Sequence, residues 1–154
     1  MLRKTTSEGR SLRERALALL ARREYSRQEL AQRLAPHAET PSALNTLLDE
    51  LVARKQLSDA RYADARATVL GRKFGTARIE HELQAKGVAA ETIARIAHAA
   101  RASELVRARG AWTRRFGRPP ADALERAKQM RFLRGRGFSF DAIRAVVGGE
   151  EASE

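Results

Sequence analysis

The chain has 154 residues, contains no cysteine and carries a formal net charge of +11 at pH 7. The lack of cysteine excludes disulfides, thiolate nucleophiles and Cys-ligated metal sites. We find no apolar run of the ~18 residues that a membrane span requires, so no membrane partner is expected. The large positive charge indicates a polyanionic partner, because Lys and Arg side chains that neutralise phosphates release bound counterions.

The positive charge is concentrated in the last third of the chain. Residues 101–147 carry a net charge of +8, whereas residues 11–57 and 58–100 carry +2 each and residues 148–154 carry −3. A composition biased toward Arg and Ala is an alternative explanation, in which the charges only solvate helix faces. The uneven distribution favours a basic functional surface beyond residue 100.

Local signals predict helices along the whole chain and no sheet, because Ala, Leu, Arg and Glu dominate the composition. Apolar residues at helical spacing predict a first helix within residues 11–23. Ser26 and Glu29 have the spacing of a capping box, so a second helix begins near Ser26. Thr40 and Pro41 predict an N-cap followed by proline in the first helical position of a third helix.

An internal repeat follows when the sequence is shifted against itself. A shift of 49 residues places Tyr25 on Phe74, and a shift of 50 residues places Gly87 on Gly137. The matched glycine is expected between the second and third helices of a unit, where a left-handed C-cap requires it. We therefore predict an all-α protein of three tandem three-helix repeats.

Stacking of such repeats is expected to form an elongated, curved array. The third repeat has an insertion around Gly117 and should have a longer connection before its middle helix. The predicted parts are a flexible N-terminal segment at 1–10, repeats at 11–57, 58–100 and 101–147, and an acidic flexible tail at 148–154.

No active site is predicted. The three imidazoles, His37, His81 and His98, are far apart in the sequence. His81 begins a zinc-protease pattern, but Ala85 stands where the second histidine would be. The glycines of the segment 71–75 are better explained as a helix end and a turn than as a phosphate loop. We therefore expect no enzyme activity, no cofactor and no metal.

The aromatic residues have two interpretations. Tyr25 and Phe74 occupy equivalent repeat positions, and this equivalence favours packing in the core. Trp112 and Phe116 flank a pair of arginines, an arrangement that also grips single-stranded nucleic acid. For these two residues, core packing and surface function stay open.

Several strings resemble the bacterial RecX family, in the same order as in that family and over roughly residues 11–147. The strings are Leu57-Ser58-Asp59-x-Arg61-Tyr62-Ala63, then Arg78-Ile79-x-x-Glu82-Leu83-x-x-Lys86-Gly87-Val88, and finally Arg131-Phe132-Leu133-x-x-Arg136-Gly137-Phe138.

The resemblance implies a cytoplasmic regulator of the RecA recombinase, with a fold of three tandem three-helix repeats. It implies binding along the RecA filament on single-stranded DNA and inhibition of its ATPase, strand-exchange and coprotease activities in recombination and the SOS response. Single- or double-stranded DNA is a second expected partner, a small-molecule substrate is not expected, and the chain is expected to be a monomer. The motif residues that should define the fold are Asp59, Tyr62, Gly87, Gly137 and Phe138.

The basic third repeat supplies the predicted surface for the filament or the DNA. Its members are Arg114, Arg115, Arg118, Lys128, Arg131, Arg134 and Arg136. Two other functions stay open: a DNA-binding regulator of the helix-turn-helix type, and a helical-repeat adaptor that binds another protein and whose charge is incidental.

Overall fold

The computed structural model describes residues 10–148 and contains only helices over that range. Apart from Arg10 and Gly148, the two terminal segments predicted to be flexible lie outside the described residues. None of the described helices combines the length and the apolarity needed to cross a membrane. The prediction of an all-α fold is confirmed.

The first three-helix repeat follows the predicted caps. Ser26 Oγ accepts a hydrogen bond of 3.1 Å from the amide of Glu29, and Thr40 Oγ1 accepts one of 3.0 Å from the amide of Ala43. These bonds satisfy amides that the first turn of each helix leaves without a partner. The elements of this repeat are α1 (Leu12–Leu20), α2 (Arg27–Leu34), the 3₁₀ turn η1 (Ala35–His37) and α3 (Pro41–Ala53).

The next six helices form the second and third repeats. Gly87 and Gly137 have φ angles of 77° and 86°, so the predicted left-handed C-caps after the second helix of each repeat are present. The longer connection predicted for the third repeat runs between Arg115 and Ala123. The helices are α4 (Asp59–Gly71), α5 (Thr76–Ala85), α6 (Ala90–Ala102), α7 (Glu104–Arg115), α8 (Ala123–Gly135) and α9 (Phe140–Val147).

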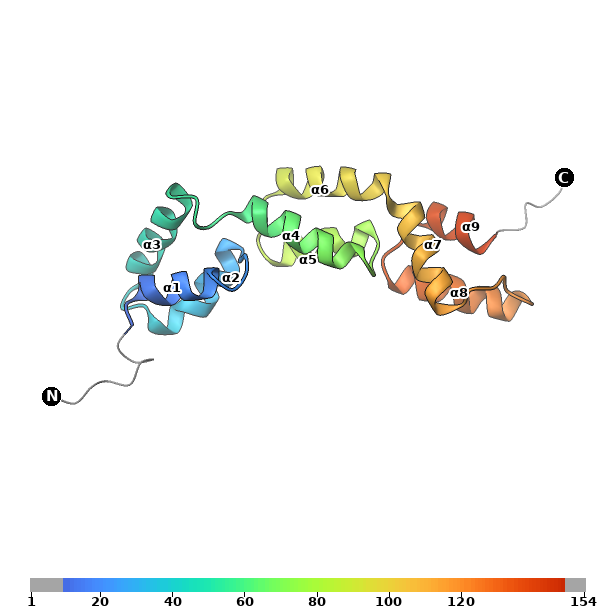
Figure 1. Cartoon of the computed structure of the whole chain (residues 1–154), viewed down its shortest axis with the longest axis horizontal. Helices are drawn as coiled ribbons and strands as arrows, with labels where there is room; N and C mark the ends of the chain where they lie inside the picture. Colours follow the sequence, from blue (N-terminus) through green and yellow to red (C-terminus); the bar gives the residue numbers. More distant parts are fainter. Residues whose placement is uncertain (1–9, 149–154) are drawn as a thin grey trace. The chain divides into compact units, whose positions relative to one another are not determined.

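The described residues divide into two compact units (Figure 1). Unit 1 holds the residues up to Ala63 together with Lys86–Val88, and unit 2 holds residues 64–85 and the residues from Ala89 onward. The turn after α5 therefore packs with the first repeat, although it belongs to the second repeat in sequence. The predicted repeat boundaries and the elongated, curved stacking of the repeats stay predictions.

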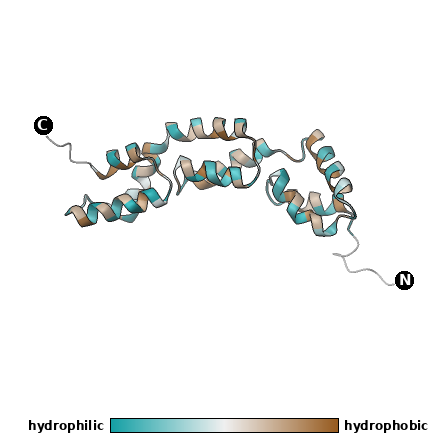
Figure 2. Ribbon diagram, turned by 180° about the vertical axis from the view of Figure 1, so that it is seen from behind, coloured by the Kyte–Doolittle hydropathy of each residue, from teal (hydrophilic) through white to brown (hydrophobic). Residues whose placement is uncertain are grey.

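Each unit has its own apolar core, and every helix carries polar residues on its other faces (Figure 2). In unit 1 the apolar face of α3 is buried, and it consists of Leu44, Leu47, Leu48 and Leu51. In unit 2, α5 packs against α6, and α9 packs against both α7 and α8. Leu133, Phe138 and Ile143 lie at the centre of the last three helices. This packing fixes α7 and α8 side by side, and the candidate site is formed there.

Candidate anion-binding site

Two glycines let the turn before α5 contact the end of α8 within unit 2. The amide of Gly75 donates a hydrogen bond of 2.8 Å to the carbonyl oxygen of Arg136. A Cβ atom on Gly75 would lie 2.3 Å from the carbonyl oxygen of Gly137, and one on Gly137 would lie 2.7 Å from Cβ of Arg78. Because no side chain fits at either position, the two backbones meet directly and bring Phe74 beside Arg136.

The residues around this contact form an alternating series of arginine and phenylalanine side chains. The Arg136 guanidinium carbon lies 5.4 Å from the ring centre of Phe74 and 5.0 Å from that of Phe132. The rings of Phe116 and Phe132 meet edge to face at 5.4 Å. A guanidinium within about 6 Å of a ring centre is attracted to the electron-rich face. We call this set the Arg–Phe cluster; its members are Phe74, Arg78, Arg115, Phe116, Phe132 and Arg136.

A pocket of about 180 Å³ opens on this cluster, and its lining is basic and aromatic. The described residues that line it include no acidic side chain. The lining residues are Lys73, Ala111, Arg114, Arg115, Phe132 and Arg136. The Arg114 side chain also donates to the carbonyl oxygen of Arg72 at 2.9 Å, which holds it beside the end of α4. Four cations around an aromatic floor suit a ligand that has both an anionic group and a planar ring.

A buried glutamine links the two helices that carry most of the pocket lining. Gln129, which is fully buried, accepts a hydrogen bond of 2.8 Å from the indole nitrogen of Trp112 and donates one of 3.1 Å to the carbonyl oxygen of Arg118. These bonds tie α7 and the long connection to α8. Trp112 also packs against the core of the last three helices, so its role is structural, whereas Phe116 belongs to the Arg–Phe cluster.

Two residues of α7 hold the turn before α5 in place through side-chain hydrogen bonds. Glu104 is buried and accepts a hydrogen bond of 2.9 Å from the amide of Thr76. The Arg107 guanidinium donates to the carbonyl oxygens of Phe74 and Ala100, the latter at 2.9 Å. Burial lowers the pKa of Arg107 from its ordinary value, and the charge of Glu104 opposes that change. Both residues hold the backbone that carries Phe74.

Unit 1 contains the same type of contact between the start of one helix and the turn after another, and we call each such contact a junction. Asp59, like Glu104, is the first residue of its helix, and it accepts a hydrogen bond of 2.7 Å from the amide of Arg27. A Cβ atom on Gly87 would lie 2.3 Å from the side chain of Gln28, which corresponds to the close approach at Gly137. These contacts support the structural role predicted for Asp59, Gly87 and Gly137.

The two junctions differ in charge. In unit 1, Glu29 is paired with Arg23 at 3.0 Å and with Lys86 at 3.7 Å. Shifts of 49 and 50 residues place Arg78 at the position of Glu29 and Arg136 at that of Lys86. The junction in unit 2 therefore has the same backbone contacts, but a guanidinium stands where the junction in unit 1 has a carboxylate. The positive charge of Arg136 has no internal counterion at that position.

The structure brings together only some of the predicted site residues. Arg114, Arg115 and Arg136 line the pocket, and Lys128 lies on the same stripe of α8 as Phe132 because it is one turn earlier. Arg118 is exposed on the long connection. Arg131 and Arg134 are exposed on other faces of α8, since one residue turns a helix by about 100°.

Sequence reasoning missed three residues of the site. Lys73, Phe74 and Arg78 come from the turn before α5, outside the strongly basic segment. Replacement of Glu29 by Arg78 in the internal repeat was the signal that could have found them. The three histidines are exposed and lie on separate elements, and no group of metal-binding side chains occurs within residues 10–148.

The fold and the pocket define a protein of tandem three-helix repeats with a basic, aromatic-lined binding surface. Family models described as "RecX, second three-helix domain" and "RecX, third three-helix domain" match residues 58–95 and 102–147. The chain belongs to the RecX family of regulatory proteins.

Relatives match the chain over most of its length. It is 51% identical over 137 residues to the regulatory protein RecX of Leptothrix cholodnii, covering 89% of this chain and 87% of that protein. It is 48% identical over 143 residues to the regulatory protein RecX of Chromobacterium violaceum, covering 93% of each. Both relatives are named regulatory proteins.

Solved structures show the same fold at low sequence identity. The crystal structure of RecX from Lactobacillus salivarius superposes with a TM-score of 0.70 at 18% identity, covering 88% of this chain and 92% of that chain. Another crystal structure, of a regulatory protein RecX, gives a TM-score of 0.74 at 16% identity. The tandem three-helix fold is therefore retained where most side chains differ.

Proposed function

We propose that this chain binds the RecA filament on DNA and inhibits its ATPase, strand-exchange and coprotease activities in recombination and the SOS response. In this proposal it acts in the cytoplasm as a monomer, by binding and not by catalysis. Membership of the RecX family supports the regulatory role. Single- or double-stranded DNA is a secondary partner.

The observation that carries the proposal is the pocket on the Arg–Phe cluster. A filament on single-stranded DNA presents both phosphates and the faces of bases. Arg115 and Arg136 offer guanidinium groups for phosphates, and Phe132 lies beside both at 5.8 and 5.0 Å from the guanidinium carbons. Arginine combined with an aromatic platform is a common means of gripping a single strand. The missing carboxylate leaves these charges available to a ligand.

ATP hydrolysis by RecA on single-stranded DNA tests the proposal directly. We expect the purified chain to slow hydrolysis in proportion to its concentration. The double variant Arg115→Gln/Arg136→Gln should need about tenfold more protein for half-inhibition, whereas Arg134→Gln, on another face of α8, should stay within about twofold.

Full-rate hydrolysis at excess chain would overturn the proposal. Binding to RecA that does not require DNA and does not respond to salt would favour the adaptor function instead, because phosphate contacts weaken with salt. Binding to one DNA sequence that survives random competitor DNA would favour the regulator of the helix-turn-helix type.

A further inference from the structure

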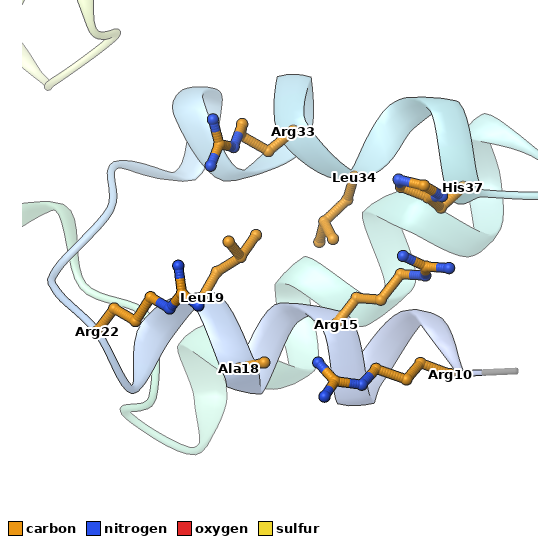
Figure 3. Close-up of a pocket in the computed structure, with 8 residues that line it drawn as sticks. All are labelled: Arg10, Arg15, Ala18, Leu19, Arg22, Arg33, Leu34 and His37. Carbon is orange, nitrogen blue, oxygen red and sulfur yellow. The ribbon is translucent and has the colours of Figure 1, made fainter. Parts of the chain in front are cut away.

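A second basic pocket lies in the first repeat, where the net charge of the sequence gives no sign of it. It has a volume of about 300 Å³ and opens between α1 and α2 (Figure 3). From α1 it takes Arg15 and Leu19, which share one face because they are four residues apart, and Arg22 comes from the turn that follows α1. Arg33 and Leu34 come from α2.

The lining of this pocket is basic around an apolar floor. Arg10 and His37 join the three arginines, and no described lining residue is acidic. In Figure 3, Arg22 and Arg33 lie at one end, Arg15 and His37 lie at the other, and Leu34 lies between them. The pocket therefore offers two sites for negative charge, separated by an apolar surface.

Other arginines of unit 1 are paired with carboxylates. Arg27 meets Asp49 at 2.7 Å and Arg61 meets Glu24 at 2.9 Å. Within the described residues, neither Arg22 nor Arg33 has a carboxylate partner, although both are on the surface. The printed carboxylate pairs of unit 1 thus lie away from this pocket, and the guanidinium groups of Arg22 and Arg33 are left for an external anion.

We propose that this pocket binds single-stranded nucleic acid, with phosphates at its two ends and one base or sugar on Leu19 and Leu34. Guanidinium groups bind phosphate oxygens in pairs, so arginine at both ends suits consecutive phosphates of one strand. The volume accommodates about one nucleotide. A base inside a duplex is stacked on its neighbours and cannot lie on this floor, which favours a single strand.

The inference does not depend on RecA. It gives the chain one nucleic-acid site in each compact unit, and two such sites on one chain raise affinity for a long strand through a high local concentration. Direct DNA binding by the chain alone can therefore succeed or fail independently of RecA inhibition.

The test measures fluorescence anisotropy of a labelled oligothymidylate with the purified chain and no RecA. The pocket variant is Arg22→Gln/Arg33→Gln, and its matched control is Arg54→Gln/Lys55→Gln, which removes two exposed charges from the same repeat outside the pocket. Both are also made in the Arg115→Gln/Arg136→Gln background, so that the site in unit 2 does not mask the result. Circular dichroism verifies that each variant is folded.

We expect the pocket variant to bind about tenfold more weakly than the control. Its slope of log affinity against log salt should fall by about 1.4, because each lost single-strand phosphate contact removes about 0.7. An affinity within twofold of the control's together with an unchanged salt slope, in both backgrounds, would overturn the proposal.

Competitors distinguish the possible ligands. Weak competition by thymidine monophosphate and no competition by a glutamate peptide of equal charge to the oligonucleotide support a phosphate site for a strand. Equal competition by the glutamate peptide would overturn the assignment to phosphate. Mononucleotide binding as tight as that of the oligonucleotide would overturn the assignment to a strand.

Discussion

The amide of Gly75 donates a 2.8 Å hydrogen bond to the carbonyl oxygen of Arg136, so the second and third repeats are joined backbone to backbone. The same contact puts the aromatic ring of Phe74 beside the Arg136 guanidinium at 5.4 Å. The stability of this junction and the geometry of the Arg–Phe cluster therefore both depend on the contact between Gly75 and Arg136.

Gly75→Ala should destabilise unit 2 strongly. Its methyl group would lie 2.3 Å from backbone oxygen, which cannot move without separating the two turns, and overpacking of this kind costs about 2 kcal/mol or more. Gly135→Ala is the control, because a Cβ there meets nothing within 4 Å, and it should raise the free energy of unfolding by about 0.5 kcal/mol. Urea unfolding measures both. Equal stability of the two variants would show that the close contact is absent.

Gln129→Leu should lower the free energy of unfolding by about 2 kcal/mol, although leucine is apolar and similar in size to glutamine. The change leaves the indole N–H of Trp112 and the carbonyl oxygen of Arg118 without their partner. Trp112 is the chain's only tryptophan, so its fluorescence reports the unfolding transition directly. Ala127→Gln, at an exposed position of α8, should change stability by less than about 0.5 kcal/mol. A neutral Gln129→Leu would mean that water replaces the amide without cost.

Arg78→Glu should give the unit 2 junction the charge arrangement of the unit 1 junction. A carboxylate beside Arg136 would compete with a bound anion, so affinity for single-stranded DNA should fall more than tenfold, with a smaller loss for Arg78→Gln. Stability should change by less than about 1 kcal/mol, because Arg78 is exposed. Anisotropy measures the affinity, and Arg109→Glu on the exposed surface of α7 controls for net charge. Equal losses for Arg78→Glu and Arg109→Glu would contradict a local effect.

Glu29 should contribute a pH-dependent part of the stability of unit 1. Burial raises the pKa of Glu29, but hydrogen bonds from Arg23 and the charges of Arg23 and Lys86 outweigh burial, and the pKa lies below its usual value. A carboxyl group with a lower pKa in the folded state stabilises the fold above its unfolded pKa of about 4.3, and this contribution is lost as the pH falls through the folded value.

Glu29→Gln should therefore lower the free energy of unfolding by at most about 1 kcal/mol at pH 7. The difference from the unmodified chain should shrink as the pH falls below about 4. Urea unfolding at pH 7 and pH 3 measures it, with the exposed Glu39→Gln as the control. A difference of constant size at both pH values would show that the ionised form of Glu29 is not responsible.

The helices could be predicted because their signals are local. The caps at Ser26 and Thr40 each involve residues three positions apart, and the buried face of α3 follows from apolar residues at helical spacing. The role of Gly87 and Gly137 was predictable because a helix that ends in a left-handed C-cap usually has glycine at that position. The three-helix repeat therefore followed from short-range patterns alone.

The sites could be predicted only in part, because they join residues far apart in the sequence. Counting charge by segment identified the basic third repeat but not Phe74 and Arg78, which reach the cluster through the contact at Gly75. The same count missed the pocket in the first repeat. A net charge of +2 over residues 11–57 does not show that Arg15, Arg22 and Arg33 gather around one pocket while other arginines of unit 1 pair with carboxylates.

We expect the buried bond from Thr76 to Glu104 to affect how the chain folds during its synthesis. Helix α5 is preceded by Gly75, which has no side chain to cap it, and it receives its acceptor from the first residue of α7, 28 positions later. A nascent chain that has emerged only as far as α6 therefore presents a complete α5 sequence with an uncapped first turn. We therefore expect the second repeat to reach its final stability only when the third repeat has begun to leave the ribosome.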